Sequence, residues 1–255
     1  MNLLLDNIFL IFKKLILFPT RLLFKIWLKP NRVVFYHIPR SGGRSLYKFY
    51  DFYINEKIYC KNDYETFKSV KFKFSHVVRK IHKKESKNTR YLTIIRKPFE
   101  RMVSRYFYLK NYAIRSDEKS NIVQKNQLSF EEYLDWLWVY GNDNLLVRMI
   151  TGKISKDMII ENKHKLKKFK KKIIRINSKD VELAKKKLKN FDVVMFENIN
   201  TFNWTKYFTN LSISFPFFNI NNFLYYNKIN YKKKYFKYMK YDYELYRYFL
   251  NKTKK

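Results

Sequence analysis

The chain has 255 residues, which is enough for one α/β domain with a hydrophobic core and short for two. Hydrophobic residues make up 46% of it and aromatic residues 20%, so the composition excludes a globally disordered chain. The formal net charge of +34 favours anionic partners such as phosphorylated cofactors, nucleic acid, acidic lipid or acidic sugars, without choosing among them. The single cysteine, Cys60, excludes an intramolecular disulfide and a thiolate metal cluster.

Residues 1–28 are rich in apolar side chains, but charged residues and Pro19 interrupt them. No uninterrupted stretch approaches the roughly 18–20 apolar residues that a spanning helix needs, and the segment lacks the order of a cleaved signal peptide. We therefore interpret 1–30 as an N-terminal amphipathic or membrane-associated helix and 31–255 as the folded domain. A helix packed on the domain and a degenerate signal anchor are the alternatives.

The first predicted strand covers 32–37 and leads through a short loop into a helix. The helix is indicated by apolar residues at i, i+3, i+4 and i+7, namely Leu46, Phe49, Tyr50 and Tyr53. Between strand and helix lie Gly42 and Gly43, two of only four glycines in the chain. Adjacent glycines in so glycine-poor a chain indicate a backbone position that other residues cannot take.

The rest of the chain alternates between strand and helix patterns. Strands are predicted at 71–77, 90–95, 173–176 and 191–196, and helices from Pro98 onward and at 129–139, 142–151, 179–189 and 232–250. Such alternation predicts a three-layer α/β fold in which helices flank a central parallel sheet.

The loop after the first strand has the pattern of an anion-binding site. Backbone N–H groups at a helix start, together with the helix dipole, attract a phosphate, and glycines let the backbone approach it closely. A Walker loop would need four residues between its glycines and a lysine before Ser or Thr, and this loop has neither. The predicted ligands are Arg40, Ser41, Gly42, Gly43, Arg44 and Ser45.

A second anion clamp is predicted at the end of the third strand. Arg96 follows this strand, Pro98 suits the first turn of a helix, and Ser104 lies two turns further on. Arg101 and Arg105 are expected on the same polar helix face as Ser104. Because a guanidinium and a hydroxyl can close on a phosphate from two sides, Arg96 and Ser104 are the predicted ligands.

Together the two motifs resemble those of carbohydrate sulfotransferases that use 3′-phosphoadenosine 5′-phosphosulfate (PAPS). Residues 34–46 resemble the family's 5′-phosphosulfate loop, His-Ile-Pro-Lys-Thr/Ser-Gly-Gly-Thr-Ser-Leu, and residues 93–104 resemble its 3′-phosphate motif, Arg-Asp-Pro-x-x-Arg-x-x-Ser. The heparan sulfate 2-O-sulfotransferase-like branch is the most similar. The resemblance spans residues 32–250 and includes similar segments at Asn144, 151–152, 191–197 and 241–246.

The resemblance implies a P-loop-like form of the α/β fold and transfer of a sulfuryl group from PAPS to a carbohydrate hydroxyl, with PAP as the product. It implies that residues 40–45 hold the 5′-phosphosulfate and that Arg40 also balances charge on the leaving oxygen. Arg96 and Ser104 would hold the 3′-phosphate. No metal is implied.

One histidine is implied as the general base. His76 lies in Ser75-His76-Val77, in the place where the family commonly has Gly-His, and an imidazole can take the proton of an attacking hydroxyl near neutral pH. His37, at the end of the first strand, is expected to orient the loop.

Three positions depart from the family pattern. Arg40 stands in place of Lys, Arg44 in place of Thr, and Lys97 in place of Asp. Arg and Lys differ in shape and in hydrogen bonding, although both carry the positive charge that the leaving group requires.

Two other classes share parts of the pattern. A P-loop kinase or NTPase has the same strand, loop and helix but needs Walker residues and Mg²⁺. A non-enzymatic nucleic-acid binder would suit the charge and the 22 tyrosines, yet the chain has no nucleic-acid motif, so no specific nucleic acid is expected. The expected location is cytoplasmic or peripheral to a membrane surface through residues 1–28, or Golgi-type anchoring if that segment is a signal anchor. The oligomeric state is open.

Overall fold

The computed structural model describes ten parts of the chain, and the rest lies outside the described residues. Outside fall residues 1–30 except Leu22, the lysine-rich stretch 163–172, and His76. No helix of the described part is long and apolar enough to cross a membrane. The described residues are 22, 32–53, 58–59, 72–75, 89–111, 123, 127–139, 143–153, 174–211 and 229–253.

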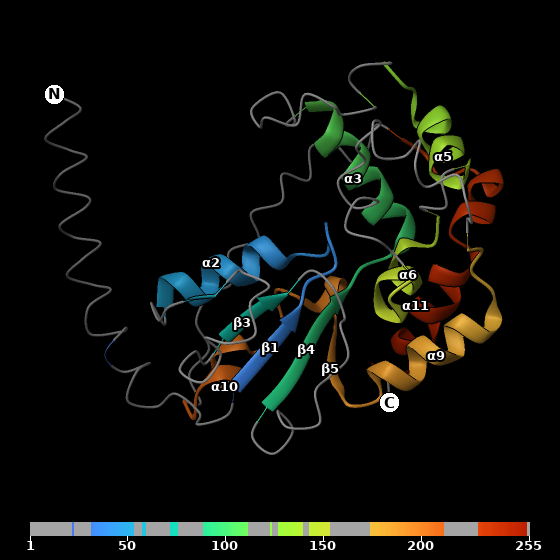
Figure 1. Ribbon diagram of the computed structural model, residues 1–255. Helices are drawn as coiled ribbons and strands as arrows, with labels where there is room; N and C mark the ends of the chain where they lie inside the picture. The colour runs from blue at the N-terminus through green and yellow to red at the C-terminus, as the bar shows by residue number, and fades with distance from the viewer. Residues whose placement is uncertain are drawn as a thin grey trace, which may run out of the picture.

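A five-stranded sheet forms the centre of the fold (Figure 1), with the strand order β2-β3-β1-β4-β5. All four pairs of neighbouring strands are parallel. The predicted α/β class with a parallel sheet flanked by helices is therefore confirmed. The strands are β1 (Arg32–Tyr36), β2 (Ile58–Tyr59), β3 (Phe72–Ser75), β4 (Thr89–Ile95) and β5 (Phe191–Met195).

Side chains of the central strands alternate between two hydrophobic cores. On β1, Val34 and Tyr36 belong to one core, whereas Val33 and Phe35 belong to the other. Successive side chains of a strand point to opposite faces, so a strand covered on both faces must be apolar throughout. This explains why β1 reads as a continuous apolar run.

The larger core lies under α3 (Pro98–Asn111), α5 (Phe130–Val139), α6 (Leu145–Thr151), α9 (Ser178–Leu188) and α11 (Lys240–Thr253). The smaller core lies under α2 (Gly43–Tyr53) and α10 (Trp204–Phe208). In the described part of the chain, the 3₁₀ helix η5 (Phe196–Asn198) follows β5, and the 3₁₀ helix η7 (Lys233–Tyr238) precedes α11.

Two predicted elements are wrong in type or extent. The described part of the predicted strand 173–176 forms no strand, and the carbonyl of Ile174 accepts a hydrogen bond from Arg148 Nη1 at 2.7 Å instead of from a neighbouring strand. The predicted single helix 232–250 is divided into η7 and α11, because the backbone leaves helical geometry at Met239, with φ −132°.

The strand order brings the two predicted motifs to one edge of the sheet. β1 pairs with β4, and because the two strands are parallel, their carboxyl ends lie at the same edge. The glycine loop follows β1 and Arg96 follows β4. In open parallel sheets, ligands bind outside the carboxyl ends of neighbouring strands whose connections diverge, as those after β1 and β4 do here.

Candidate functional site

The glycine loop is closely packed from two sides. Gly42 has φ +83°, and a Cβ there would lie 2.6 Å from Ile199 Cδ1 and 3.1 Å from the Phe196 ring. A Cβ on Gly43 would lie 2.0 Å from Cδ2 of His37. Both glycines are therefore required, the first for its left-handed backbone and the second because the imidazole contacts the backbone.

The N-terminus of α2 is formed directly by this loop. The carbonyl of Gly42 accepts hydrogen bonds from the backbone N–H groups of Ser45 at 3.0 Å and Leu46 at 3.2 Å. The side chains of Ser41 and Ser45 are both buried. Ser41 Oγ has no hydrogen-bond partner among the described residues, and a buried hydroxyl of this kind fits an oxyanion as acceptor.

The two predicted clamps meet through Arg40. Its Nε donates to Ser104 Oγ at 3.0 Å across 64 residues of chain. Its carbonyl oxygen accepts from Arg96 Nη1 at 3.1 Å. Arg40 also has φ +69°, a left-handed conformation that is uncommon outside glycine. The structure thus brings Arg40, Arg96 and Ser104 together, although the sequence places Arg40 in one predicted clamp and Arg96 and Ser104 in the other.

Aromatic rings lie under both guanidinium groups. The Arg96 guanidinium lies 4.1 Å from the centre of the Phe196 ring, and the Arg40 guanidinium lies 4.8 Å from the centre of the Tyr108 ring. Arg96 is buried, and its Nε lies 3.8 Å from Glu100 Oε2. Stacking on rings fixes the planes of the guanidinium groups and therefore the directions of their N–H donors.

The polar face predicted for α3 is buried in the structure. Arg101, Ser104 and Arg105 are all buried, and Arg101 Nη2 donates to Asp242 Oδ2 at 3.2 Å. The partner lies 141 residues away, so helix periodicity alone could not find it. The one signal in the sequence is an acidic residue, Asp242, in the tyrosine-rich segment 241–246.

Other predicted residues fall at the edges of this site or outside it. His76 and the side chain of Arg44 lie outside the described residues. His37 is half-buried against Gly43, in the position expected for orienting the loop. Glu197, just after β5, accepts a hydrogen bond from Tyr246 OH at 2.6 Å.

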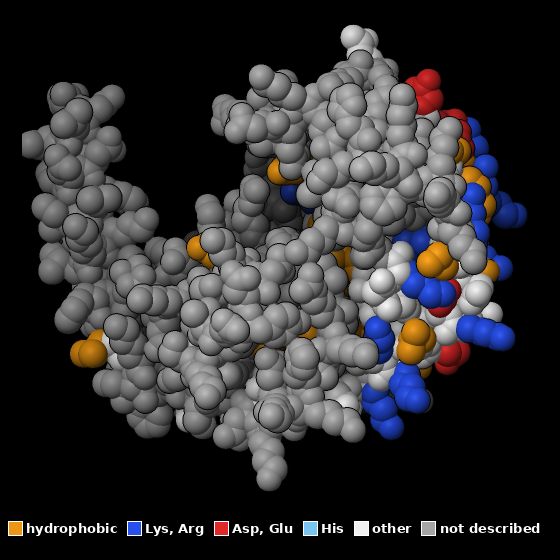
Figure 2. Space-filling view, viewed as in Figure 1, with side chains coloured by type: hydrophobic (Ala, Val, Ile, Leu, Met, Phe, Trp, Pro, Cys, Tyr) orange, Lys and Arg blue, Asp and Glu red, His pale blue; other side chains and the backbone are white. Residues whose placement is uncertain are grey.

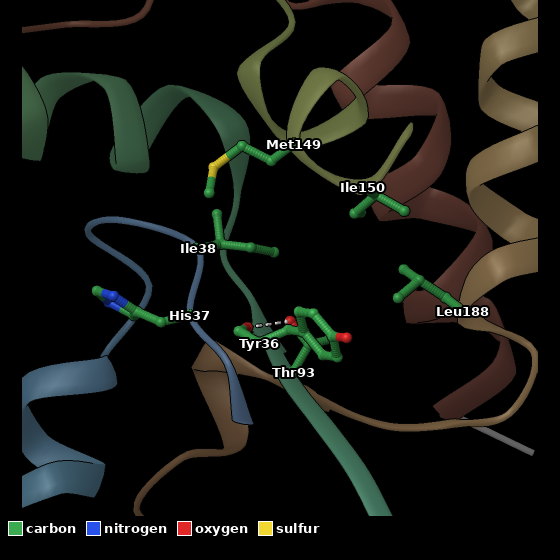
Figure 3. A pocket seen from close by; sticks show the side chains of 7 residues that line it. All are labelled: Tyr36, His37, Ile38, Thr93, Met149, Ile150 and Leu188. Carbon is green, nitrogen blue, oxygen red and sulfur yellow. Dashed lines mark hydrogen bonds between the residues drawn. The ribbon is translucent and has the colours of Figure 1, made fainter. Parts of the chain in front are cut away.

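A small pocket lies on the α6 and α9 side of the loop (Figure 3). Thr93 Oγ1, in its wall, is occupied by a hydrogen bond to the Tyr36 carbonyl at 2.9 Å. The His37 ring points away from the other lining residues, toward α2. The lining is mostly apolar and consists of Tyr36, His37, Ile38, Thr93, Met149, Ile150 and Leu188. This pocket is distinct from the charged Arg40–Arg96–Ser104 cluster.

The described surface is strongly basic on the side that carries α9 and α11 (Figure 2). Exposed lysines there include Lys186, Lys189 and Lys240. Within the described ranges, no group of three or more His, Cys, Asp or Glu side chains could hold a metal ion.

Comparison with known proteins adds no assignment. No model of a known protein family matches the chain, and no curated protein matches its sequence. The site therefore has to be interpreted from its own residues: buried guanidinium groups, hydroxyls and a glycine loop at a helix start are groups that bind anions in other proteins.

Proposed function

We propose that the protein is a PAPS-dependent sulfotransferase of P-loop-like fold that transfers a sulfuryl group to a carbohydrate hydroxyl. One observation carries the proposal: Arg40 of the glycine loop donates to Ser104, and Arg96 donates to the carbonyl of Arg40. Two motifs that resemble the two phosphate-binding motifs of one enzyme family are in direct contact.

The donor requires two such motifs side by side. PAPS carries a phosphosulfate on the 5′ side of its ribose and a phosphate on the 3′ side. The loop amides, Ser41 and Ser45 fit the 5′ group, since glycines allow backbone approach and the Ser41 hydroxyl is buried without a partner among the described residues. Arg96 and Ser104 fit the 3′-phosphate through charge-assisted hydrogen bonds.

The proposed reaction is an in-line displacement at sulfur. The acceptor hydroxyl oxygen forms a bond to sulfur while the bond between sulfur and the 5′-phosphate oxygen breaks, and PAP leaves with that electron pair. Arg40 stabilises the negative charge that develops on the leaving oxygen. His76, which lies outside the described residues, takes the hydroxyl proton.

Calorimetric titration tests the donor assignment against the other two classes. We expect tight binding of PAP with no dependence on Mg²⁺, weaker binding of ATP, and no specific binding of a short oligonucleotide. A kinase or NTPase would instead bind ATP in a Mg²⁺-dependent manner. A nucleic-acid binder would bind the oligonucleotide with a steep dependence on salt. Either result would replace the proposal.

Incubation with labelled PAPS and a panel of polysaccharides tests the reaction and its acceptor class. Label should appear on at least one polysaccharide. In this assay His76→Ala should lose most of its kcat and keep its PAP affinity, whereas His164→Ala, a histidine in a lysine-rich segment, should behave as the wild type. If PAP binds and no polysaccharide is labelled, the carbohydrate acceptor is wrong while the donor assignment stands.

A further inference from the structure

The starts of helices α6 and α11 cap each other. Asp242, in the first turn of α11, accepts hydrogen bonds from the backbone N–H groups of Leu146 at 3.1 Å and Val147 at 2.9 Å, at the start of α6. Asn144, which precedes α6, accepts through its Oδ1 from the N–H groups of Tyr241 at 2.9 Å and Asp242 at 3.2 Å. The free N–H groups of each helix start are thus satisfied by the other segment, which fixes α6 and α11 relative to each other.

The same carboxylate also holds the helix that carries the site. Asp242 Oδ2 accepts from Arg101 Nη2 of α3 at 3.2 Å, and both side chains are almost fully buried. Arg101 Nε and Nη1 have no hydrogen-bond partner in the described part of the chain, so Asp242 is the main anchor of this guanidinium there. Burial lowers the pKa of Arg101 and raises that of Asp242, and their mutual attraction opposes both shifts.

The anchor lies one helical turn from a predicted ligand of the anion site. Arg101 and Ser104 are separated by three residues on α3 and therefore share a helix face. Ser104 Oγ accepts from Arg40 Nε at 3.0 Å, and Arg96 lies two residues before Pro98, the first residue of the same helix. A rotation or shift of α3 would move Ser104 away from the glycine loop.

We propose that Arg101, Asp242 and Asn144 are positioning residues for the anion site, acting through the orientation of α3 rather than by touching the ligand. The first turn of the C-terminal helix is thereby part of the functional machinery, although it lies 138 residues from Ser104 in sequence. The inference rests on the proposed function for the identity of the ligand, and on the contacts alone for the positioning.

The test removes the Arg101–Asp242 ion pair without leaving one of its two buried charges unpaired. In the double variant Arg101→Met with Asp242→Asn, both charges are absent, and the amide oxygen at position 242 can still accept from one of the two N–H groups of α6, so the protein should fold. We expect its PAP affinity to fall by about tenfold to a hundredfold, as for small displacements of other positioned groups. Asp192→Asn is the control, because Asp192, like Asp242, accepts from an arginine side chain but lies on β5 at the other end of the sheet. Its PAP affinity should equal that of the wild type.

Two further measurements separate positioning from general stability. At a temperature where every variant is folded, adding Ser104→Ala to the double variant should cost little more PAP affinity, whereas Ser104→Ala alone should cost much, because a displaced hydroxyl no longer contributes. Hydrogen–deuterium exchange of peptides covering 38–45 and 98–111 should be faster in the double variant and unchanged in Asp192→Asn.

The outcomes distinguish the two proposals. If the wild type does not bind PAP, the proposed function is wrong. Hydrogen–deuterium exchange then still decides whether the Arg101–Asp242 contact orders α3 and the glycine loop. If the wild type binds PAP and the double variant retains its affinity and its exchange rates, the positioning role is overturned.

Discussion

β4 carries an arginine near each of its ends, and the two arginines are held in different ways. Arg90, near the amino end, contacts Asp192 Oδ2 through Nε at 3.2 Å and Nη2 at 3.1 Å, and its guanidinium lies 4.1 Å from the centre of the Tyr207 ring. Arg96, just past the carboxyl end, lies at the same 4.1 Å from the Phe196 ring but donates to the backbone of the glycine loop.

Under the proposed function, this difference separates a structural end of the sheet from a ligand-binding end. The Arg90 side chain is 32% exposed and joins β4 to a carboxylate of β5, so its charge is balanced within the sheet. The Arg96 side chain is 1% exposed and joins β4 to the loop that begins α2. A buried guanidinium acts in a medium of lower effective dielectric constant, where an arriving anion is attracted more strongly than at the surface.

The largest expected effect is on ligand affinity at the carboxyl end. Arg96→Ala should weaken PAP binding by about a hundredfold or more, because it removes a buried charged partner of the proposed 3′-phosphate and releases the Arg40 carbonyl. Arg90→Ala should leave PAP affinity unchanged. Isothermal titration calorimetry measures both.

Equal losses of affinity in the two variants would show that the arginines act only through the stability of β4. Wild-type affinity in Arg96→Ala would remove the 3′-phosphate assignment altogether. In both cases the contrast between the two ends of the sheet would fail.

The next largest effect, on stability and PAP affinity, is expected for a substitution in the glycine loop. Gly43→Ala should destabilise the protein by about 1–3 kcal/mol, since the new Cβ overlaps the His37 ring and one of the two must move. PAP affinity should fall with it. Adding His37→Ala should restore part of the stability, because the overlapping ring is then absent. Urea unfolding and calorimetry give the two quantities.

Gly152→Ala is the control for this loop. Gly152 has φ +79°, but a Cβ there would have no neighbour within 4 Å, so the cost is backbone strain of about 1–2 kcal/mol alone. PAP affinity should not change. If it falls as far as in Gly43→Ala, the loop effect is a general consequence of lower stability.

The local part of the site could be predicted from the sequence, and the long-range part could not. Gly42, Gly43 and Arg40 lie in one segment whose pattern indicates a strand, an anion-binding loop and a helix, and the alternation of later elements indicates a parallel sheet. Parallel pairing then requires that Arg96 and the loop lie at the same edge. These steps need only spacing and topology.

Contacts made by buried polar side chains do not follow from such patterns. Arg101 has the spacing of a polar helix face, yet it is buried, and its partner is the carboxylate of Asp242 on α11. Likewise, 173–176 has the composition of a strand, yet the described Ile174 gives its carbonyl to Arg148. In each case the hydrogen-bond partner is a side chain distant in sequence, and only the tertiary structure shows which residue it is.

A smaller effect is expected at the amino end of β4. Arg90→Ala should lower the free energy of unfolding by about 1 kcal/mol or less, because a partly exposed ion pair is weakened by solvent and salt. The Tyr207 hydroxyl, which also donates to Asp192 at 2.8 Å, would remain as a partner of the carboxylate. Urea unfolding measures the loss. A loss above about 3 kcal/mol would be typical of a broken buried ion pair and would contradict the interpretation of Arg90–Asp192 as a partly exposed one.

The smallest effect is expected on thermal stability and concerns the exposed carboxylate of Glu131. It shows how much a surface charge alone contributes to stability. Glu131 accepts from Lys234, from Lys232 at 3.0 Å and from Tyr235 OH at 2.9 Å. The bond from Lys234 is the main reason that the pKa of Glu131 falls from 4.5 to about 2. Since the folded protein holds this proton more weakly than the unfolded chain does, the stabilisation is present above pH 4.5 and is lost as the pH falls toward about 2.

Glu131→Gln should therefore have a slightly lower Tm than the wild type near neutral pH, and the two melting curves should converge as the pH falls below about 4.5. Lys234→Met should show a similar convergence, because it removes the main donor to the same carboxylate. High salt should reduce both differences, as expected for charges in contact with solvent. A Tm difference that is constant with pH would mean that Glu131 contributes through packing rather than through its charge.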